Sequence, residues 1–185
     1  MKKLLTCLAM ILVSSVAIAE TEPFNLSLTP DVSVYGRGAR IEGVTLSVWG
    51  ENEQSSLALG IVNGFTGKSV GVSLGLLNYA DNYTGLQWGL VNYVKQDSMG
   101  WGGGFFGFMI SAVNYTGGTM KGFYTGVVNY SGNLTGLQLG LINYVDDADS
   151  GVQVGLINII HQNKSWFSGL PSELAPGMIL VNWRF

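Results

Sequence analysis

The stretch GLQLGLINY, from Gly136 to Tyr144, decides the fold of this chain because copies of it recur along most of the sequence. Positions 1 and 5 of the unit are small, positions 2, 4, 6 and 7 are apolar, position 8 is Asn and position 9 is usually Tyr. The other copies are GVSLGLLNY at Gly71, GLQWGLVNY at Gly85, GFMISAVNY at Gly107, GFYTGVVNY at Gly122 and GVQVGLINI at Gly151, with weaker ones at Gly43 and Ser56. One structural unit is therefore repeated about eight times, so function belongs to the assembled array.

Large apolar residues alternate with small or polar ones in each copy, which is the period of a β-strand. In the Gly136 copy, Leu137, Leu139 and Leu141 face one side, while Gln138 and its neighbouring glycines face the other. Helix is a poor fit because each internal Gly costs a helix about 0.8–1 kcal/mol relative to Ala. We expect these residues to form an outward, membrane-facing surface: Val72, Leu74, Leu76, Leu86, Trp88, Leu90, Leu137, Leu139 and Leu141.

Turn-forming residues separate the copies, and equivalent Asn residues lie 14 or 15 positions apart except between Asn92 and Asn114. All four prolines lie outside the repeat block. This rhythm suits an all-β chain forming an antiparallel up-and-down meander that closes into a small barrel of about 8–10 strands. Strand-end tyrosines would then alternate between the two rims as interfacial aromatics. They are Tyr79, Tyr93, Tyr115, Tyr130 and Tyr144.

A parallel β-solenoid is the alternative fold. A unit copied in one direction at a spacing near 15 would stack coil on coil and bring identical Asn side chains into a hydrogen-bonded ladder. Antiparallel order would not align those residues. The irregular spacing and the aromatic C-terminus favour the barrel, so we expect the barrel and keep the solenoid open.

The N-terminus predicts export. Lys2 and Lys3 precede an apolar run that ends at Ala17-Ile18-Ala19, which is the pattern of a secretory signal peptide. We expect residues 1–19 to be removed and residues 20–185 to form a single domain. The single cysteine, Cys7, would leave with the signal, so we expect no disulfide and no thiolate metal site.

Composition narrows the function class. Charged residues make up 11% of the chain, against roughly 25% in ordinary soluble domains. Removing Lys2 and Lys3 from the nine basic residues leaves seven against 12 acidic ones, so we expect no nucleic-acid partner.

The C-terminal segment from Met178 to Phe185 alternates apolar residues and ends in Phe. In this respect it resembles bacterial outer-membrane β-barrels, and the resemblance implies that Trp183 and Phe185 act as a signal for the barrel-assembly machinery. The repeat itself resembles that of bacterial surface-repeat proteins with G-L-Q-x-G-L-x-N units, best at Gly85–Tyr93 and Gly136–Asn158. That second resemblance implies location at the cell surface more than any activity.

Candidate chemistry is sparse. His161, near Ser165 and Ser168, lacks an accompanying acid or nucleophile elbow, and we interpret it as a loop or rim residue. Asp146, Asp147 and Asp149 lack the Gly and Glu spacing of a calcium loop. We therefore expect no catalytic residue, no cofactor and no metal.

These patterns predict a small outer-membrane barrel or surface-repeat protein with a structural or interaction role and outer-membrane lipid as its partner. The alternative is a secreted or periplasmic soluble repeat protein that binds a partner along a flat face. Oligomeric state is left open by the sequence.

Overall fold

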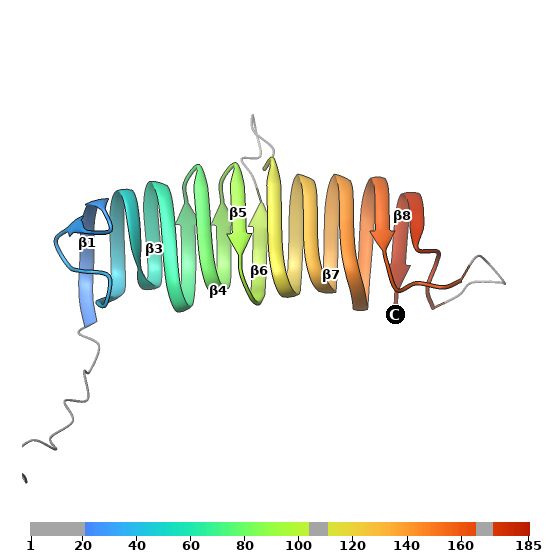
Figure 1. The fold of residues 1–185 in the computed structure, drawn as a ribbon, viewed down its shortest axis with the longest axis horizontal. Helices are drawn as coiled ribbons and strands as arrows, with labels where there is room; N and C mark the ends of the chain where they lie inside the picture. The colour runs from blue at the N-terminus through green and yellow to red at the C-terminus, as the bar shows by residue number, and fades with distance from the viewer. Residues whose placement is uncertain (1–20, 104–110, 166–171) are drawn as a thin grey trace, which may run out of the picture.

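The chain forms one continuous row of stacked β-coils in the computed structural model, which describes residues 21–103, 111–165 and 172–185 (Figure 1). The predicted signal peptide lies outside the described residues. The strands are β1 (Thr21–Thr29), β2 (Val32–Ser33), β3 (Arg40–Leu74), β4 (Leu77–Trp88), β5 (Val91–Val94), β6 (Ser98–Gly103), β7 (Val113–Ile160) and β8 (Gly177–Arg184). Strands β3 and β7 are long because each runs through several coils without a break.

Successive coils pair in parallel and in register with the sequence unit. Asn63 pairs with Asn78, and Asn78 pairs in turn with Asn92. The pairing continues from Asn92 to Asn114. Each unit therefore lies directly on the equivalent residues of the preceding one, and the architecture is a parallel β-solenoid.

The predicted antiparallel meander and its closure into a barrel are wrong. Among the described strands, antiparallel pairing is found at the two ends of the stack, at β1–β2 and β7–β8. The physical reason lies in the buried Asn column, whose amides meet like partners only when the coils run in the same direction. The prediction of an all-β fold is confirmed. The pairing of the strands is that of the alternative fold, the parallel β-solenoid.

Asn side chains at position 8 form an internal ladder. Each Nδ2 donates to the Oδ1 of the next Asn at 2.8 or 2.9 Å. Several of these amides also donate their second N–H to a backbone carbonyl, as Asn114 does to Thr125 at 3.0 Å. The amide oxygen and the amide N–H groups of these buried side chains thereby have hydrogen-bond partners. Because each Asn must lie beside the next one, the ladder fixes the register of the coils along the stack. Its members are Asn63, Asn78, Asn92, Asn114, Asn129, Asn143 and Asn158, all essentially inaccessible to solvent.

Buried apolar side chains form two clusters in the interior, beside further buried polar residues such as Gln138 and Gln153. Phe65, Tyr83 and Val94 belong to the first, and Met120, Leu134 and Val145 belong to the second. They occupy positions just after the Asn column and on the wall opposite it. The interior therefore combines a hydrogen-bonded polar column with a hydrophobic core.

Glycine at position 1 allows the coils to approach closely. Gly122 has φ +129°, and a Cβ built there would lie 1.9 Å from the carbonyl oxygen of Gly100. At Gly122 a side chain is therefore disfavoured both by the backbone conformation and by the neighbouring coil, whereas Ser56 occupies position 1 of its copy with φ +134°.

The long interval between Asn92 and Asn114 arises from extra residues inside one coil. Gly100 pairs with Gly85 on one side and with Gly122 on the other. Position 1 of this coil is therefore Gly100, and the copy predicted to begin at Gly107 was placed too late. Residue 107 itself lies outside the described residues.

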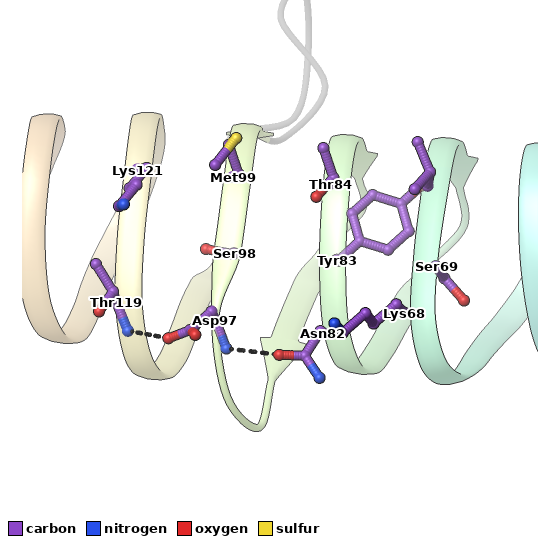
Figure 2. Close-up of a pocket in the computed structure, with 11 residues that line it drawn as sticks. Lys68, Ser69, Asn82, Tyr83, Thr84, Asp97, Ser98, Met99, Thr119 and Lys121 are labelled. Carbon is purple, nitrogen blue, oxygen red and sulfur yellow. Dashed lines mark hydrogen bonds between the residues drawn. The ribbon is translucent and has the colours of Figure 1, made fainter.

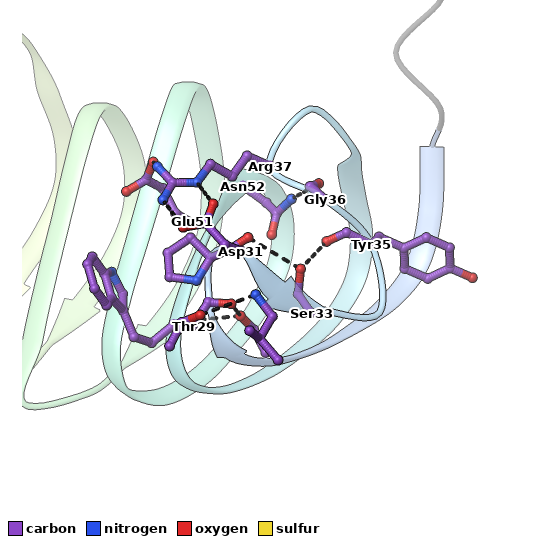
Figure 3. Close-up of polar contacts among 12 residues, drawn as sticks. Thr29, Asp31, Ser33, Tyr35, Gly36, Arg37, Glu51 and Asn52 are labelled. Carbon is purple, nitrogen blue, oxygen red and sulfur yellow. Dashed lines mark hydrogen bonds and ion pairs between the residues drawn. The ribbon is translucent and has the colours of Figure 1, made fainter.

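Both ends of the stack carry caps. At the N-terminal end, β2 folds back antiparallel on β1. Arg37 holds this cap through Asp31 at 3.1 Å and Glu51 at 2.9 Å (Figure 3). At the other end β8 runs antiparallel to the last coil, and Asn182 closes the buried column there by donating to the carbonyl of Asn158.

Candidate functional site: an apolar band outside the solenoid

The residues predicted to face a membrane lie on the outside of the stack. None of the nine is buried, and Leu76 and Leu141 are 51% and 56% exposed. The intervening side chains Ser73, Gln87 and Gln138 point inward and are buried. The period-two pattern thus assigned the two faces correctly in a different architecture, while contact with lipid stays a prediction.

The surface is larger than those nine residues. Positions 2, 4, 6 and 7 face outward in most of the described copies, whereas Thr125 at position 4 of the Gly122 copy is buried. We call the outward surface that these positions form the apolar band. Its most exposed members include Phe24, Leu26, Leu28, Val44, Leu46, Val48, Trp49, Ile61, Leu76, Leu90, Leu141, Ile142, Val154, Leu156 and Ile157. The nine predicted residues lie in the copies at Gly71, Gly85 and Gly136, and the part of the band before Ser56 was not predicted, although the weak copy at Gly43 has the same alternation.

The band turns a corner at position 6. The chain bends at Gly75-Leu76 and again at Gly89-Leu90, where the ladder between β4 and its neighbours is interrupted. Leu76, Leu141 and Leu156 at this corner are 51%, 56% and 61% exposed, while Leu90 is 37% exposed. The band is therefore convex, with position 6 at its ridge.

A shallow apolar hollow lies on this ridge. Leu74, Leu76 and Leu90 form its walls and Gly75 and Gly89 lie between them, enclosing about 350 Å³. The glycines at position 5 create the hollow because they leave a gap between the large side chains at positions 4 and 6. An alkyl segment is the chemical group that such a surface accommodates.

Charged side chains lie outside the band, on the rest of each coil, and Glu42 and Lys121 directly precede position 1 of their copies. In the described repeats, positions 2, 4, 6 and 7 carry no charged residue. Asp81, Lys95 and Asp146 occupy position 11 of their coils, and Asp147 follows at position 12. The solenoid is therefore amphipathic around its circumference, and this separation persists along the stack.

A row of stacked tyrosines borders the band at position 9. The ring centroids of Tyr93 and Tyr115 are 4.9 Å apart, and those of Tyr115 and Tyr130 are 4.8 Å apart, with nearly parallel planes. Tyr144 continues the stack at 5.4 Å. The prediction that these residues alternate between two rims is wrong, since parallel coils place them in one row.

Two tyrosine hydroxyls in this row bond to carboxylates, and that of Tyr79 also accepts from the indole N–H of Trp49 at 3.0 Å. Tyr130 donates to Asp146 at 2.9 Å, and this bond, more than burial, raises the pKa of Tyr130 to about 12. Tyr79 donates to Glu51, and burial followed by this bond raises the pKa of Tyr79 to about 12. Both phenols are therefore neutral donors at physiological pH.

The two residues predicted as an assembly signal lie at the C-terminal cap. The backbone of Trp183 accepts from Leu174 at 3.1 Å, and the N–H of Phe185 donates to Ser172 at 2.8 Å. The side chain of Phe185 is 65% exposed. An exposed terminal ring is compatible with recognition by another protein, which remains a prediction.

A second pocket of about 350 Å³ lies on a flank outside the band (Figure 2). Lys68 and Lys121 stand at its ends, and Asp97 accepts from the backbone N–H of Thr119 at 2.7 Å between them. The Asp97 carboxylate therefore supports the chain turn, and no nucleophile with a general base meets there among the described residues.

The other candidate groups have structural surroundings. Asp146 and Asp147 bond Tyr130 and Arg184 respectively, so they belong to the tyrosine row and the C-terminal cap. His161 is exposed. Within residues 21–103, 111–165 and 172–185, no cluster of His, Cys, Asp or Glu has the arrangement of a metal site, and no helix is long and apolar enough to cross a membrane.

Comparisons with family models, curated proteins and solved structures found no match.

Proposed function

We propose that this chain is an exported protein of the bacterial cell envelope with a structural or interaction role, and that it acts by docking its apolar band on an apolar partner. The role is one of binding, with no catalysis and no cofactor. The outer membrane is the proposed location, and the resemblance of the repeat to that of surface-associated proteins supports it.

The observation that carries this proposal is the inverted distribution of side chains. A hydrogen-bonded Asn column lies inside the stack while leucines such as Leu76, Leu141 and Leu156 lie outside it. Contiguous exposed apolar surface of this extent is rare on monomeric soluble proteins and marks sites of interaction with proteins or membranes.

Expression of the full chain, followed by cell fractionation, tests the proposal. The chain should lose residues 1–19 and appear in the envelope fraction, from which detergent but not salt releases it. A variant with Leu76→Asp, Leu90→Asp and Leu141→Asp should move to the soluble fraction.

The matched control changes solvent-accessible residues outside the band. Thr84→Asp, Thr135→Asp and Ser150→Asp together add the same three negative charges just before the Gly of position 1, and this variant should stay in the envelope. Recovery of the wild-type chain as a soluble monomer would contradict the proposal.

Soluble secretion is the second candidate. The parallel stack favours it, because parallel solenoids need no lipid to satisfy their backbone groups. Under this candidate the processed wild-type chain is found in the periplasm or medium without detergent, bound to a protein partner along its flank.

A further inference from the structure

We infer that the apolar band docks on the hydrocarbon of one leaflet of an uncharged lipid layer, with the long axis of the solenoid parallel to the membrane plane. This inference rests on the proposed function and names both the partner and the geometry.

The orientation follows from the direction in which polarity changes. Apolar and charged residues are separated around each coil, while the pattern is constant from one end of the stack to the other. A solenoid crossing the bilayer along its axis would place Asp81, Lys95 and Asp146 in the hydrocarbon, where charges are disfavoured. With the axis in the plane, the band enters the lipid along its whole length and these charges stay in water.

The depth follows from the exposure of the ridge. Leu76, Leu141 and Leu156 at position 6 are more exposed than Ile142 and Ile157 at position 7. The ridge is therefore the deepest part of the docked molecule. Its hollow beside Leu74 and Leu90 accepts a lipid chain segment.

The convex shape selects lipid over a second copy of the chain. Two convex ridges touch along a line and bury little area, whereas a stable protein interface needs about 800 Å² on each partner. A fluid lipid layer adapts to a ridge, and a band roughly 40 Å long, at about 4.8 Å per strand step, engages it throughout.

The tyrosine row fits the boundary between lipid and water. Tyr93, Tyr115, Tyr130 and Tyr144 lie at position 9, between the apolar position 7 and the charged position 11. The hydroxyl of Tyr130 points to Asp146, on the charged side. Amphipathic rings of this kind gather at the level of lipid headgroups.

The charge balance selects an uncharged lipid. Acidic residues outnumber basic ones, and the band itself carries no lysine or arginine that would attract anionic headgroups. Binding should therefore depend on apolar contact and change little with ionic strength.

Depth-dependent fluorescence quenching tests the geometry. The mature chain lacks cysteine because Cys7 precedes the predicted cleavage site, so single cysteines accept one fluorophore each. Labels at Leu28→Cys, Leu90→Cys and Leu156→Cys sample the ridge near both ends and the middle, and labels at Asp81→Cys and Asp147→Cys sample the charged side. The probe is a phosphatidylcholine vesicle containing a chain-brominated analogue.

The three ridge labels should be quenched to a similar extent, and the two labels on the charged side should not respond. A gradient of quenching from one end of the stack to the other, or quenching at Asp147→Cys, would overturn the parallel geometry. Circular dichroism of each labelled protein confirms that the stack is intact.

Vesicle flotation separates this inference from the proposed function. Leu141→Asp should weaken phosphatidylcholine binding about tenfold or more, because a leucine side chain no longer enters the hydrocarbon, and Thr135→Asp should not.

If the wild-type chain does not float with these vesicles although cells hold it in the envelope, the lipid partner is wrong and the proposed function stands. If the wild-type chain neither floats with the vesicles nor is held in the envelope, the lipid partner and the proposed function are both wrong. A dimer in sedimentation that hides the Leu90→Cys label without lipid overturns the inference in favour of a second copy.

Discussion

Replacing Asn114 with Ala should strongly destabilise the stack, because this residue lies in the middle of the amide ladder. Its Nδ2 donates to Asn129 at 2.8 Å and to the carbonyl of Thr125 at 3.0 Å. Its Oδ1 accepts from Asn92 at 2.9 Å. The variant therefore leaves buried polar groups without these partners on both neighbouring coils.

The expected loss is about 3–5 kcal/mol in the free energy of unfolding, since each orphaned buried group costs about 1–3 kcal/mol. Asn158→Ala, at the end of the ladder, removes a neighbour on one side only and should cost about half as much. Asn82→Ala is the matched control, because its contacts are exposed and longer than 3.2 Å, and it should change stability by about 0.5 kcal/mol or less.

Urea unfolding followed by circular dichroism measures these differences. The reasoning is refuted if Asn114→Ala costs less than about 1 kcal/mol, or no more than the exposed control. An Asn114→Leu variant adds a second check: it fills the space with apolar atoms and should remain well below wild type, because its neighbours still lack partners.

Three further changes probe other features of the stack. Gly122→Ala should prevent stable folding, because its Cβ meets the carbonyl of Gly100, whereas Gly38→Ala has open space and should be neutral in the same thermal melts. Raising the pH should weaken the fold through Tyr130, whose pKa is raised to about 12 from 10 by its bond to Asp146: the stabilisation is complete below pH 10 and is lost as pH rises towards 12 and above. Tyr130→Phe keeps the ring stack and should flatten this part of the pH dependence of the melting temperature; an unchanged slope would contradict the assignment. Phe185→Ala should leave stability almost unchanged because the ring is 65% exposed, so a lower yield in the envelope with equal stability would support its predicted assembly role, and an equal yield would argue against it.

The sequence predicted which side chains face outward because strand geometry alone decides that pattern. Leu137 and Gln138 point in opposite directions in any strand, whether it belongs to a barrel or to a solenoid. Whether neighbouring strands run parallel or antiparallel depends on the path of the turns between them. Turn residues such as Asp81-Asn82 suit both a hairpin of a barrel and a corner of a solenoid coil. The decisive signal was the repeated Asn: a buried amide in every copy needs an equivalent partner beside it, and this requirement outweighs the aromatic C-terminus.

The candidate site was predicted in part for the same reason. The nine outward residues were found from their alternation, but the turning of the band at position 6 and the single tyrosine row depend on the path of each coil. The copy predicted at Gly107 was placed wrongly because the sequence from Gly107 to Tyr115 resembles the unit, although Gly100 takes position 1. Comparing Gly100-Trp101 with Gly85-Leu86 was the available clue.

The antiparallel β8 strand has a consequence for assembly. A stack of identical parallel rungs offers its last rung as a template for the first rung of another molecule, which is how open strand edges lead to fibres. Here the final strand runs the opposite way and is itself covered by contacts with Ser172 and Leu174, while β2 folds over β1 at the other end. End-to-end growth through an open rung is thereby hindered, whereas duplication of a repeat within the gene lengthens the stack by a whole rung.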